Sequence, residues 1–211
     1  MKLYDCTMAP NPRRARIFLA EKAIELTKVE VNIVEGENLA PPFLAINPRG
    51  LLPVLELDDG TRIDEVMAIC RYFEAVQPQP PLLGRTPKEQ ALIISRQRKM
   101  EFDGMIAGSE VFRNQHAKFA GRSIPGGGTD AIPAIPALVS RGQQTLERFF
   151  YWLETYLGDS EYVAGDSFSM ADITALCAVD FVAWVQIPVP TANLRTRAWH
   201  AKVSARPSAL A

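Results

Sequence analysis

The pattern of the chain changes at one short proline-rich segment, Gln77–Pro87, which reads QPQPPLLGRTP. Before this segment, alternating apolar and polar residues predict short strands mixed with helices. After it, the pattern is helical throughout. Because a segment with so many prolines is typical of a linker, we expect a domain boundary there. The sequence therefore predicts a small α/β domain over residues 1–77 and an all-helical domain over residues 88–211.

The first of these domains alternates strands and helices. Lys2–Asp5 and Lys28–Val34 alternate like strands, and Asn11-Pro12 resembles an N-cap followed by proline at the first helical position. Asp59-Gly60 is a strong signal for a two-residue hairpin turn. The remaining predicted elements are a helix over 11–23, a short helix over 43–46, hairpin strands over 54–57 and 61–63, and a helix over 65–76.

The second domain carries clear helix boundaries. Thr86 and Glu89 fit a capping box that starts a helix running to about Asn114, and Ser169 and Asp172 fit another. Three successive glycines, Gly126–Gly128, predict a mobile loop within residues 120–136. Further helices are predicted over 137–157 and around Trp199 near the end of the chain.

Composition excludes several classes of protein. With 23 basic and 24 acidic residues, the net charge of −1 gives no general attraction to nucleic acid or to anionic membranes. Three distant cysteines argue against a disulfide framework and against a zinc site, so we expect no metal. The most apolar run, Ile173–Val185, is short and contains Asp180, which predicts a buried helix rather than a membrane span. Since Asp5 follows the first residues too closely for a signal peptide, we expect a soluble cytoplasmic protein.

Pro53 stands where the first hairpin strand begins, although proline cannot donate a ladder hydrogen bond. Prolines often start strands, which is one explanation. A cis Leu52-Pro53 bond is the other, because it would turn the backbone of Leu52 outward toward an extended, peptide-like ligand. Only about 5–6% of such bonds are cis, so the proline by itself leaves both explanations open.

Three stretches together resemble one enzyme family. They are NPRGLLPVLELDDGTRIDEVMAI in the first domain, YVAGDSFSMADI in the second, and YDCTMAPNPRRARIFLAEK near the start. The first two resemble long motifs of the cytosolic glutathione transferases, and the third is similar to a fungal and bacterial branch that lacks the usual catalytic Tyr, Ser or Cys. The resemblance implies a thioredoxin-like α/β domain followed by an all-α domain, with glutathione as co-substrate.

The same resemblance implies how glutathione is held. It implies that Pro53 is cis and that Leu52 pairs its backbone with the cysteinyl unit of the tripeptide. It also implies that Glu65 accepts the γ-glutamyl ammonium, although a carboxylate at a helix start is also favoured by the helix dipole alone. Val66 replaces a common serine that helps to hold the γ-glutamyl carboxylate, so we expect weaker binding through a backbone N–H. Asn38 matches a glutathione-contacting position in relatives, or is a plain loop residue.

The group that activates the thiol is harder to assign. The first strand–helix turn contains no serine or tyrosine, which leaves Thr7 as a hydroxyl donor, while Asn11 is more typical of a cap than of a catalyst. The branch resemblance points to Ser109, which with a histidine would hold a catalytic water. His116 shares its helical face but lies about 10.5 Å along the axis, too far for a direct bond. Their structural alternatives are a serine bonded to its own backbone and a favourable charge at a helix end.

Two further groups of residues have open interpretations. Arg13, Arg14 and Arg16 crowd the first turns of a helix, where the dipole disfavours cations, so they are either paired in the fold or form an electropositive rim. Gly104 and Gly108 weaken a helix and indicate close packing, at a dimer interface or beside a bulky substrate.

The leading hypothesis is a detoxifying glutathione transferase that conjugates glutathione to small apolar electrophiles and forms a homodimer, as the resemblance implies. Glutathione-dependent peroxide reduction is an alternative. A non-catalytic adaptor that keeps the fold is another, and Val66 with the missing nucleophile favours it.

Overall fold

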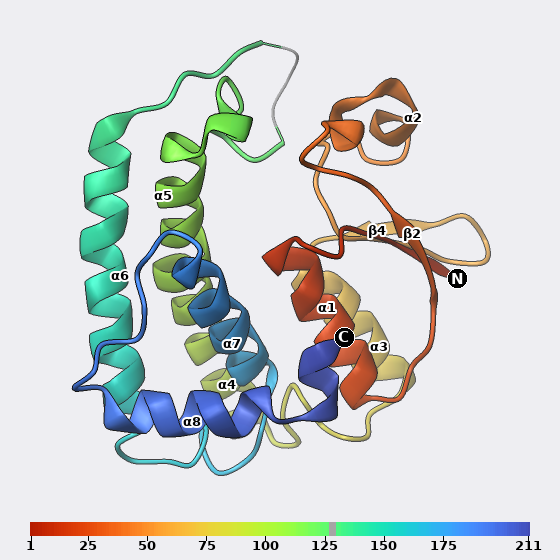
Figure 1. Cartoon of the computed structure of the whole chain (residues 1–211). Helices are drawn as coiled ribbons and strands as arrows, with labels where there is room; N and C mark the ends of the chain where they lie inside the picture. Colours follow the sequence, from red (N-terminus) through yellow and green to blue (C-terminus); the bar gives the residue numbers. More distant parts are fainter. Residues whose placement is uncertain (127–129) are drawn as a thin grey trace.

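The computed structural model describes residues 1–126 and 130–211. The chain forms a sheet-containing domain and a larger helical domain that lie side by side (Figure 1). This arrangement confirms the expected thioredoxin-like α/β domain followed by an all-α domain. The loop predicted around Gly126–Gly128 includes positions 127–129, which lie outside the described residues.

The N-terminal domain is built on a four-stranded mixed sheet. Its strand order is β2-β1-β3-β4, with β1 parallel to β2 and antiparallel to β3, and β3 antiparallel to β4. Helices α1 and α3 pack against each other, and Leu3, Phe18, Leu55 and Phe73 fill the core with at most 1% exposure. The element bounds are β1 Lys2–Asp5, α1 Pro10–Glu21, β2 Thr27–Glu30, η1 Glu37–Leu39, α2 Pro41–Leu44, β3 Val54–Glu56, β4 Arg62–Asp64 and α3 Val66–Val76.

Two local predictions in this domain were wrong. Helix α1 is capped by Ala9 and starts at Pro10, so Asn11 lies inside its first turn and is not the cap. The second strand ends at Glu30 rather than Val34, because the side chain of Asn32 accepts hydrogen bonds from the N–H groups of Val34 and Glu35 and turns the chain. The hairpin around Asp59-Gly60 is present as predicted.

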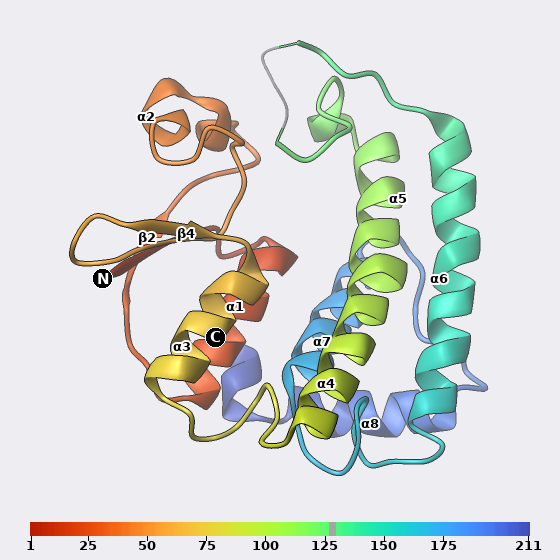
Figure 2. The ribbon, with the colours of Figure 1, turned by 180° about the vertical axis from the view of Figure 1, so that it is seen from behind.

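The helical domain begins with one long, continuous helix that the sequence predicted. It contains a feature that the sequence did not indicate, a π-helical turn, η2, between α4 and α5 (Figure 2). The bounds are α4 Pro87–Met100, η2 Glu101–Ile106, α5 Ala107–Gln115, η3 Ala117–Phe119, α6 Pro136–Tyr156, α7 Met170–Ala183, α8 Leu194–Ser204 and η4 Pro207–Leu210.

Helix α7 is the centre of this domain. It is buried along almost its whole length, as expected for the apolar run, and it packs against α4, η2 and α1. Its capping box, formed by Ser169 and Asp172, is present as predicted. Among the described residues, no helix is both long and apolar enough to span a bilayer.

The two helical glycines pack within the chain, not at a dimer interface or beside a substrate. A Cβ at Gly104 would lie 2.8 Å from both Ala178 and Phe149, and one at Gly108 would lie 2.9 Å from Val182. These distances are too short for a side chain, so the glycines allow α6 and α7 to approach the long helix closely.

Candidate functional site

The turn before Pro53 is held by three asparagine side chains. The amide groups of Asn38, Asn47 and Asn11 donate to the carbonyl oxygens of residues 50, 51 and 52 in turn, at 2.7, 2.9 and 3.1 Å. The Leu52-Pro53 bond is cis, as expected. Asn38 therefore has a structural partner, while its Oδ1 is buried and has no hydrogen-bond partner within the described residues. Three successive peptide groups are thus fixed in orientation.

Glu65 stands beside this turn at the start of α3. Its backbone has a φ of +67°, a region that residues other than glycine occupy at a cost of about 1–3 kcal/mol. Its side chain is 62% exposed, and Arg49 Nη1 lies 3.7 Å away. A strained residue with an exposed carboxylate is typical of a ligand-binding position.

Val66 follows at the first position of α3 and points the other way. Its side chain is only 2% exposed and belongs to the main hydrophobic core. Because it contributes to packing, the group it can offer to an anion is its backbone N–H at the helix N-terminus.

At the β1–α1 turn, both predicted residues already have partners. The hydroxyl and the backbone N–H of Thr7 donate to the carboxylate of Glu30, the hydroxyl at 2.8 Å. Asn11 is half-buried and uses its amide for Leu52 and its Oδ1 for Arg14. Thr7 and Asn11 thus lie near each other, but each is engaged within the protein.

All three arginines of α1 are paired, so they do not form an electropositive rim. Arg13 bonds to Asp180, Arg14 to Glu101 and Arg16 to Asp5, at 2.5, 2.9 and 2.6 Å. Burial raises the pKa of Glu101, but the charge and hydrogen bond of Arg14 outweigh this effect and leave that pKa below its ordinary value. Two of the three pairs join the domains.

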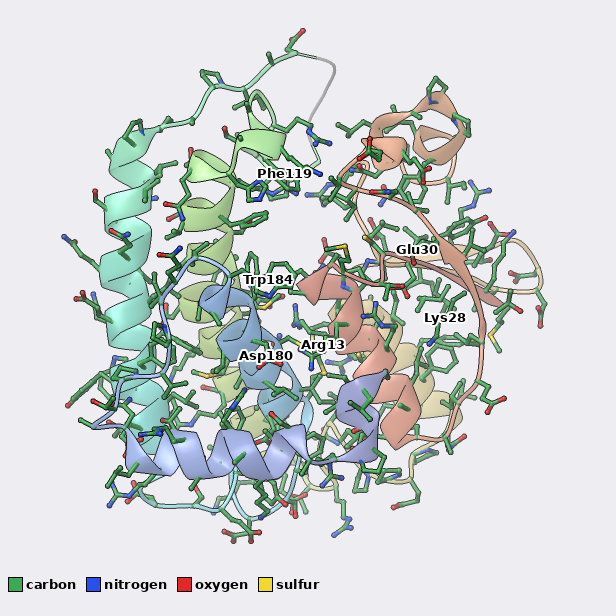
Figure 3. The ribbon with its side chains drawn as sticks, viewed as in Figure 1. Arg13, Lys28, Glu30, Phe119, Asp180 and Trp184 are labelled. Carbon is green, nitrogen blue, oxygen red and sulfur yellow. The ribbon has the colours of Figure 1, made fainter. Side chains whose placement is uncertain are left out.

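The helical domain contributes an aromatic pocket. It has a volume of about 560 Å³ and is lined by Phe112, Gln115, His116, Gln143, Trp184 and residues 185–187. The ring of Phe112 contacts those of His116, Phe119, Phe181 and Trp184. Phe119 and Trp184 lie on the side of the helical domain that faces the N-terminal domain (Figure 3). The pocket thus combines the aromatic rings of Phe112 and Trp184 with the side-chain amides of three glutamines.

Ser109 and His116 flank Phe112 on this part of the chain. Ser109 is half-buried on α5, and its hydroxyl makes no hydrogen bond within the described residues, so the back-bonded alternative does not hold. His116 follows the last residue of α5, and its Nδ1 accepts from the N–H of Lys118 at 3.3 Å. This bond caps the 3₁₀ turn η3 that follows, so the imidazole of His116 has a structural contact at the end of α5.

A loop from the helical domain reaches over to the N-terminal domain above the pocket. Arg122 donates to the carbonyl oxygens of Ile33 and Val34 at 2.9 and 3.0 Å, and to that of Lys118 at 2.7 Å. Arg113 donates to the carbonyl of Arg122. Burial, together with the charge of Arg122, lowers the pKa of Arg113 to about 10. We call this bridge the Arg122 contact.

Other chemistries find little support among the described residues. Burial raises the pKa of Cys70 to about 12 and that of Cys177 to about 11, so neither thiol ionises readily. In the described part of the chain, no group of three His, Cys, Asp or Glu side chains could hold a metal ion.

Comparison with known proteins decides the family. Residues 9–76 match the family model described as glutathione S-transferase, N-terminal domain, and residues 125–207 match the one described as glutathione S-transferase, C-terminal domain. The chain belongs to the glutathione S-transferase family. It is therefore a glutathione transferase, and glutathione is its co-substrate.

Similar members of the glutathione S-transferase family match along the full chain. Glutathione S-transferase 2 of Saccharomyces cerevisiae is 36% identical over 211 residues, covering 99% of this chain and 87% of the relative. The crystal structure of Gtt2 from the same yeast has a TM-score of 0.91 at 35% identity, with 100% of both chains covered. A glutathione S-transferase domain-containing protein from Marinobacter aquaeolei VT8 has a TM-score of 0.90 at 34% identity, with 99% of both covered.

Sequence reasoning did not predict the partners of several residues around the Pro53 turn and between the domains. Asn47 was part of a quoted motif, but its role as a holder of the Leu51 carbonyl was not foreseen. Arg14 gave one signal, an unfavourable position near the N-terminus of a helix, which a paired arginine explains. Glu101 and Arg122 gave none, because their partners lie 87 and 89 residues away in the sequence.

Proposed function

We propose that this transferase conjugates the thiolate of glutathione to small apolar electrophiles, in a homodimer located in the cytoplasm and acting in detoxification. One observation carries the proposal: a turn fixed by three asparagines at a cis-proline lies in one domain, and an aromatic pocket lies in the other. The first suits a tripeptide, and the aromatic rings of the second would contact an apolar acceptor. We assign the glutathione-binding domain to residues 1–77 and the acceptor domain to residues 88–211.

Glutathione would extend along the Pro53 turn. The N–H of Leu52, which has no hydrogen-bond partner within the described residues, would donate to the cysteinyl unit like a strand edge. The exposed carboxylate of Glu65 would accept the γ-glutamyl ammonium, and the backbone N–H of Val66 would donate to the γ-glutamyl carboxylate. Asn38 would act through Gly50, whose carbonyl it holds.

The sulfur would then lie near the start of α1. A thiol with a pKa of about 8.5 must be lowered by about 2 units, or about 2.7 kcal/mol, to be mostly thiolate at neutral pH. A helix N-terminus supplies up to about 2 kcal/mol and one charge-assisted hydrogen bond about 1.5–3 kcal/mol. These two sources suffice without a tyrosine, serine or cysteine in the turn, as in the fungal and bacterial branch.

We assign the donor to a water held by Ser109, with His116 close to the same pocket. The hydroxyl of Ser109 is free of protein partners within the described residues, whereas that of Thr7 is donated to Glu30. We expect Ser109→Ala to lower kcat about tenfold with little change in glutathione affinity, because the hydroxyl acts on developing thiolate charge. Thr7→Ala is the paired control. Loss of turnover in Thr7→Ala with full activity in Ser109→Ala would overturn the assignment.

Binding separates this enzyme from an adaptor. The transferase should be retained on immobilised glutathione and eluted by the free tripeptide, whereas an adaptor should flow through. Assays with an aromatic electrophile and with an organic hydroperoxide then separate conjugation from peroxide reduction. A mass of one chain in sedimentation would contradict the homodimer.

A further inference from the structure

A continuous chain of hydrogen bonds leads from the helical domain to the Pro53 turn. Glu101 Oε1 accepts from Arg14 Nη1 at 2.9 Å, and the same nitrogen donates to Asn11 Oδ1 at 2.9 Å. The amide of Asn11 donates to the carbonyl of Leu52 at 3.1 Å. The guanidinium also donates to Thr174 Oγ1 of α7 at 3.2 Å. Two groups of the helical domain therefore hold the arginine that holds Asn11.

The donor and acceptor roles along this series of hydrogen bonds follow from the chemistry of its side chains. A guanidinium carries only donors, so the oxygen of Asn11 must face Arg14 and its NH₂ group must face Leu52. Arg14 is 1% exposed and Glu101 is 16% exposed, so water competes little for these bonds. The ion pair thereby sets the orientation of the Asn11 amide, and the amide sets that of the Leu52 carbonyl.

We propose that Arg14 and Glu101 are positioning residues for glutathione, acting through Asn11 on the peptide group of Leu52. The inference rests on the proposed function, in which the N–H of Leu52 donates to the cysteinyl unit. Asn11 fixes the carbonyl of the Leu52–Pro53 peptide group, while Asn47 fixes the Leu51–Leu52 peptide group that carries the Leu52 N–H. The two bonds together leave the backbone of Leu52 one orientation toward the cysteinyl unit. The glutathione site is then completed by the π-helical turn η2 of the other domain, since Glu101 is its first residue.

The neighbouring arginine supplies a matched control. Arg13 lies on the same helix and also crosses to the helical domain, where it bonds to Asp180 and to the carbonyl of Ala209 (Figure 3). None of its bonds leads to the Pro53 turn. Loss of Arg13 should therefore weaken the domain contact without changing the presentation of Leu52.

Asn11→Asp tests the direction of the chain. The carboxylate would keep, and even strengthen, the bond to Arg14, but an ionised aspartate cannot donate to the carbonyl of Leu52. We expect glutathione affinity, measured by calorimetric titration, to fall about tenfold while the thermal midpoint is unchanged or higher. If Asn11 had only a structural role, glutathione affinity and the thermal midpoint would fall together. Unchanged affinity in Asn11→Asp would overturn the proposal.

Glu101→Gln gives a second, independent measurement. It removes the charge that holds Arg14 but keeps the size of the side chain, and we expect affinity for glutathione to fall about threefold or more. Arg13→Gln should leave affinity unchanged. Equal losses in the two variants would show a general effect of domain contact and would overturn the positioning role. A wild-type protein that binds no glutathione would overturn the proposed function itself, and the inference with it.

Discussion

Two of the polar contacts between the domains are built from different chemistry. Near the start and end of α1, charged pairs cross the boundary: Arg13–Asp180, Arg14–Glu101 and Arg206–Glu21, which we call the ionic interface. Above the aromatic pocket, the Arg122 contact uses only backbone carbonyls as acceptors. A carboxylate loses its charge when it is protonated, whereas a backbone carbonyl does not titrate. The stability contributed by the ionic interface should therefore depend on pH, and that of the Arg122 contact should not.

The ionic interface and the Arg122 contact connect different parts of the two domains. The ionic interface is partly buried and fixes the helix that carries Asn11, so in the proposed binding mode it would set the geometry of the glutathione side. The Arg122 contact joins two loops, of which one leads into α6 and the other follows β2. Because it lies between loops, this contact should open at lower cost than the packed helices.

The largest expected effect lies in the ionic interface. Glu101→Ala leaves the buried guanidinium of Arg14 without its counter-charge, and we expect a loss of about 3 kcal/mol in the free energy of unfolding. Denaturant titration measures it. Arg98→Ala is the control, because Arg98 bonds to the same carboxylate at 2.5 Å but is 49% exposed, and should cost at most about 1 kcal/mol. Equal losses of unfolding free energy in Glu101→Ala and Arg98→Ala would show that burial does not strengthen the Arg14–Glu101 pair.

A smaller effect is expected at Asp180, and it depends on pH. Burial raises the pKa of Asp180, but hydrogen bonds from His200 and Arg13 outweigh it and hold the pKa below its ordinary value of 3.8. A lowered pKa in the folded state means that the carboxylate stabilises the fold above pH 3.8 and that this contribution is lost as pH falls through the folded value.

Asp180→Asn should therefore cost about 1–2 kcal/mol at neutral pH and progressively less as the protein is acidified below pH 3.8. Unfolding experiments on the wild-type protein and on Asp180→Asn across this pH range measure the difference between their free energies of unfolding. A gap that stays constant with pH would show that the charge of Asp180 contributes nothing. The same comparison with Arg122→Gln should give a difference in unfolding free energy that does not change on acidification, because the partners of Arg122 at Ile33 and Val34 are backbone carbonyls.

The smallest expected effect belongs to the Arg122 contact. Arg122→Gln removes bonds to Ile33 and Val34, and we expect a loss of about 1 kcal/mol or less in global stability. Hydrogen exchange should nevertheless rise in the loop over 31–36, while α1 stays protected. Faster exchange in α1 would show that the two contacts are not separate.

Local patterns predicted much of the fold. The hairpin at Asp59-Gly60 and the capping box at Ser169 each depend on residues that lie close together in the sequence. The cis bond before Pro53 was expected from the family resemblance, because the proline by itself left both isomers open. Asn11 was misjudged for the opposite reason. Its amide has a long-range partner, the carbonyl of Leu52, 41 residues away, and this bond outweighs its preference for the cap position.

The candidate site was predicted less completely than the fold. The positions of Glu65 and Leu52 came from motifs, whereas the side-chain direction of Val66 depends on packing that no local pattern encodes. The π-helical turn also has no sequence signal, so a helical wheel with uniform spacing gives the wrong phase between residues before and after it.

That turn contains one residue more than an α-helix of the same length needs, and each residue rotates a helix by about 100°. A single deletion between Glu101 and Ile106 would restore regular spacing and leave Phe112 and Ser109 in their present direction, because the wider turn takes up the extra residue without turning the helix that follows. Such a variant should still bind glutathione and should keep turnover of its acceptor. Loss of one codon at this place thus leaves the two sides of the proposed site in the same relative orientation.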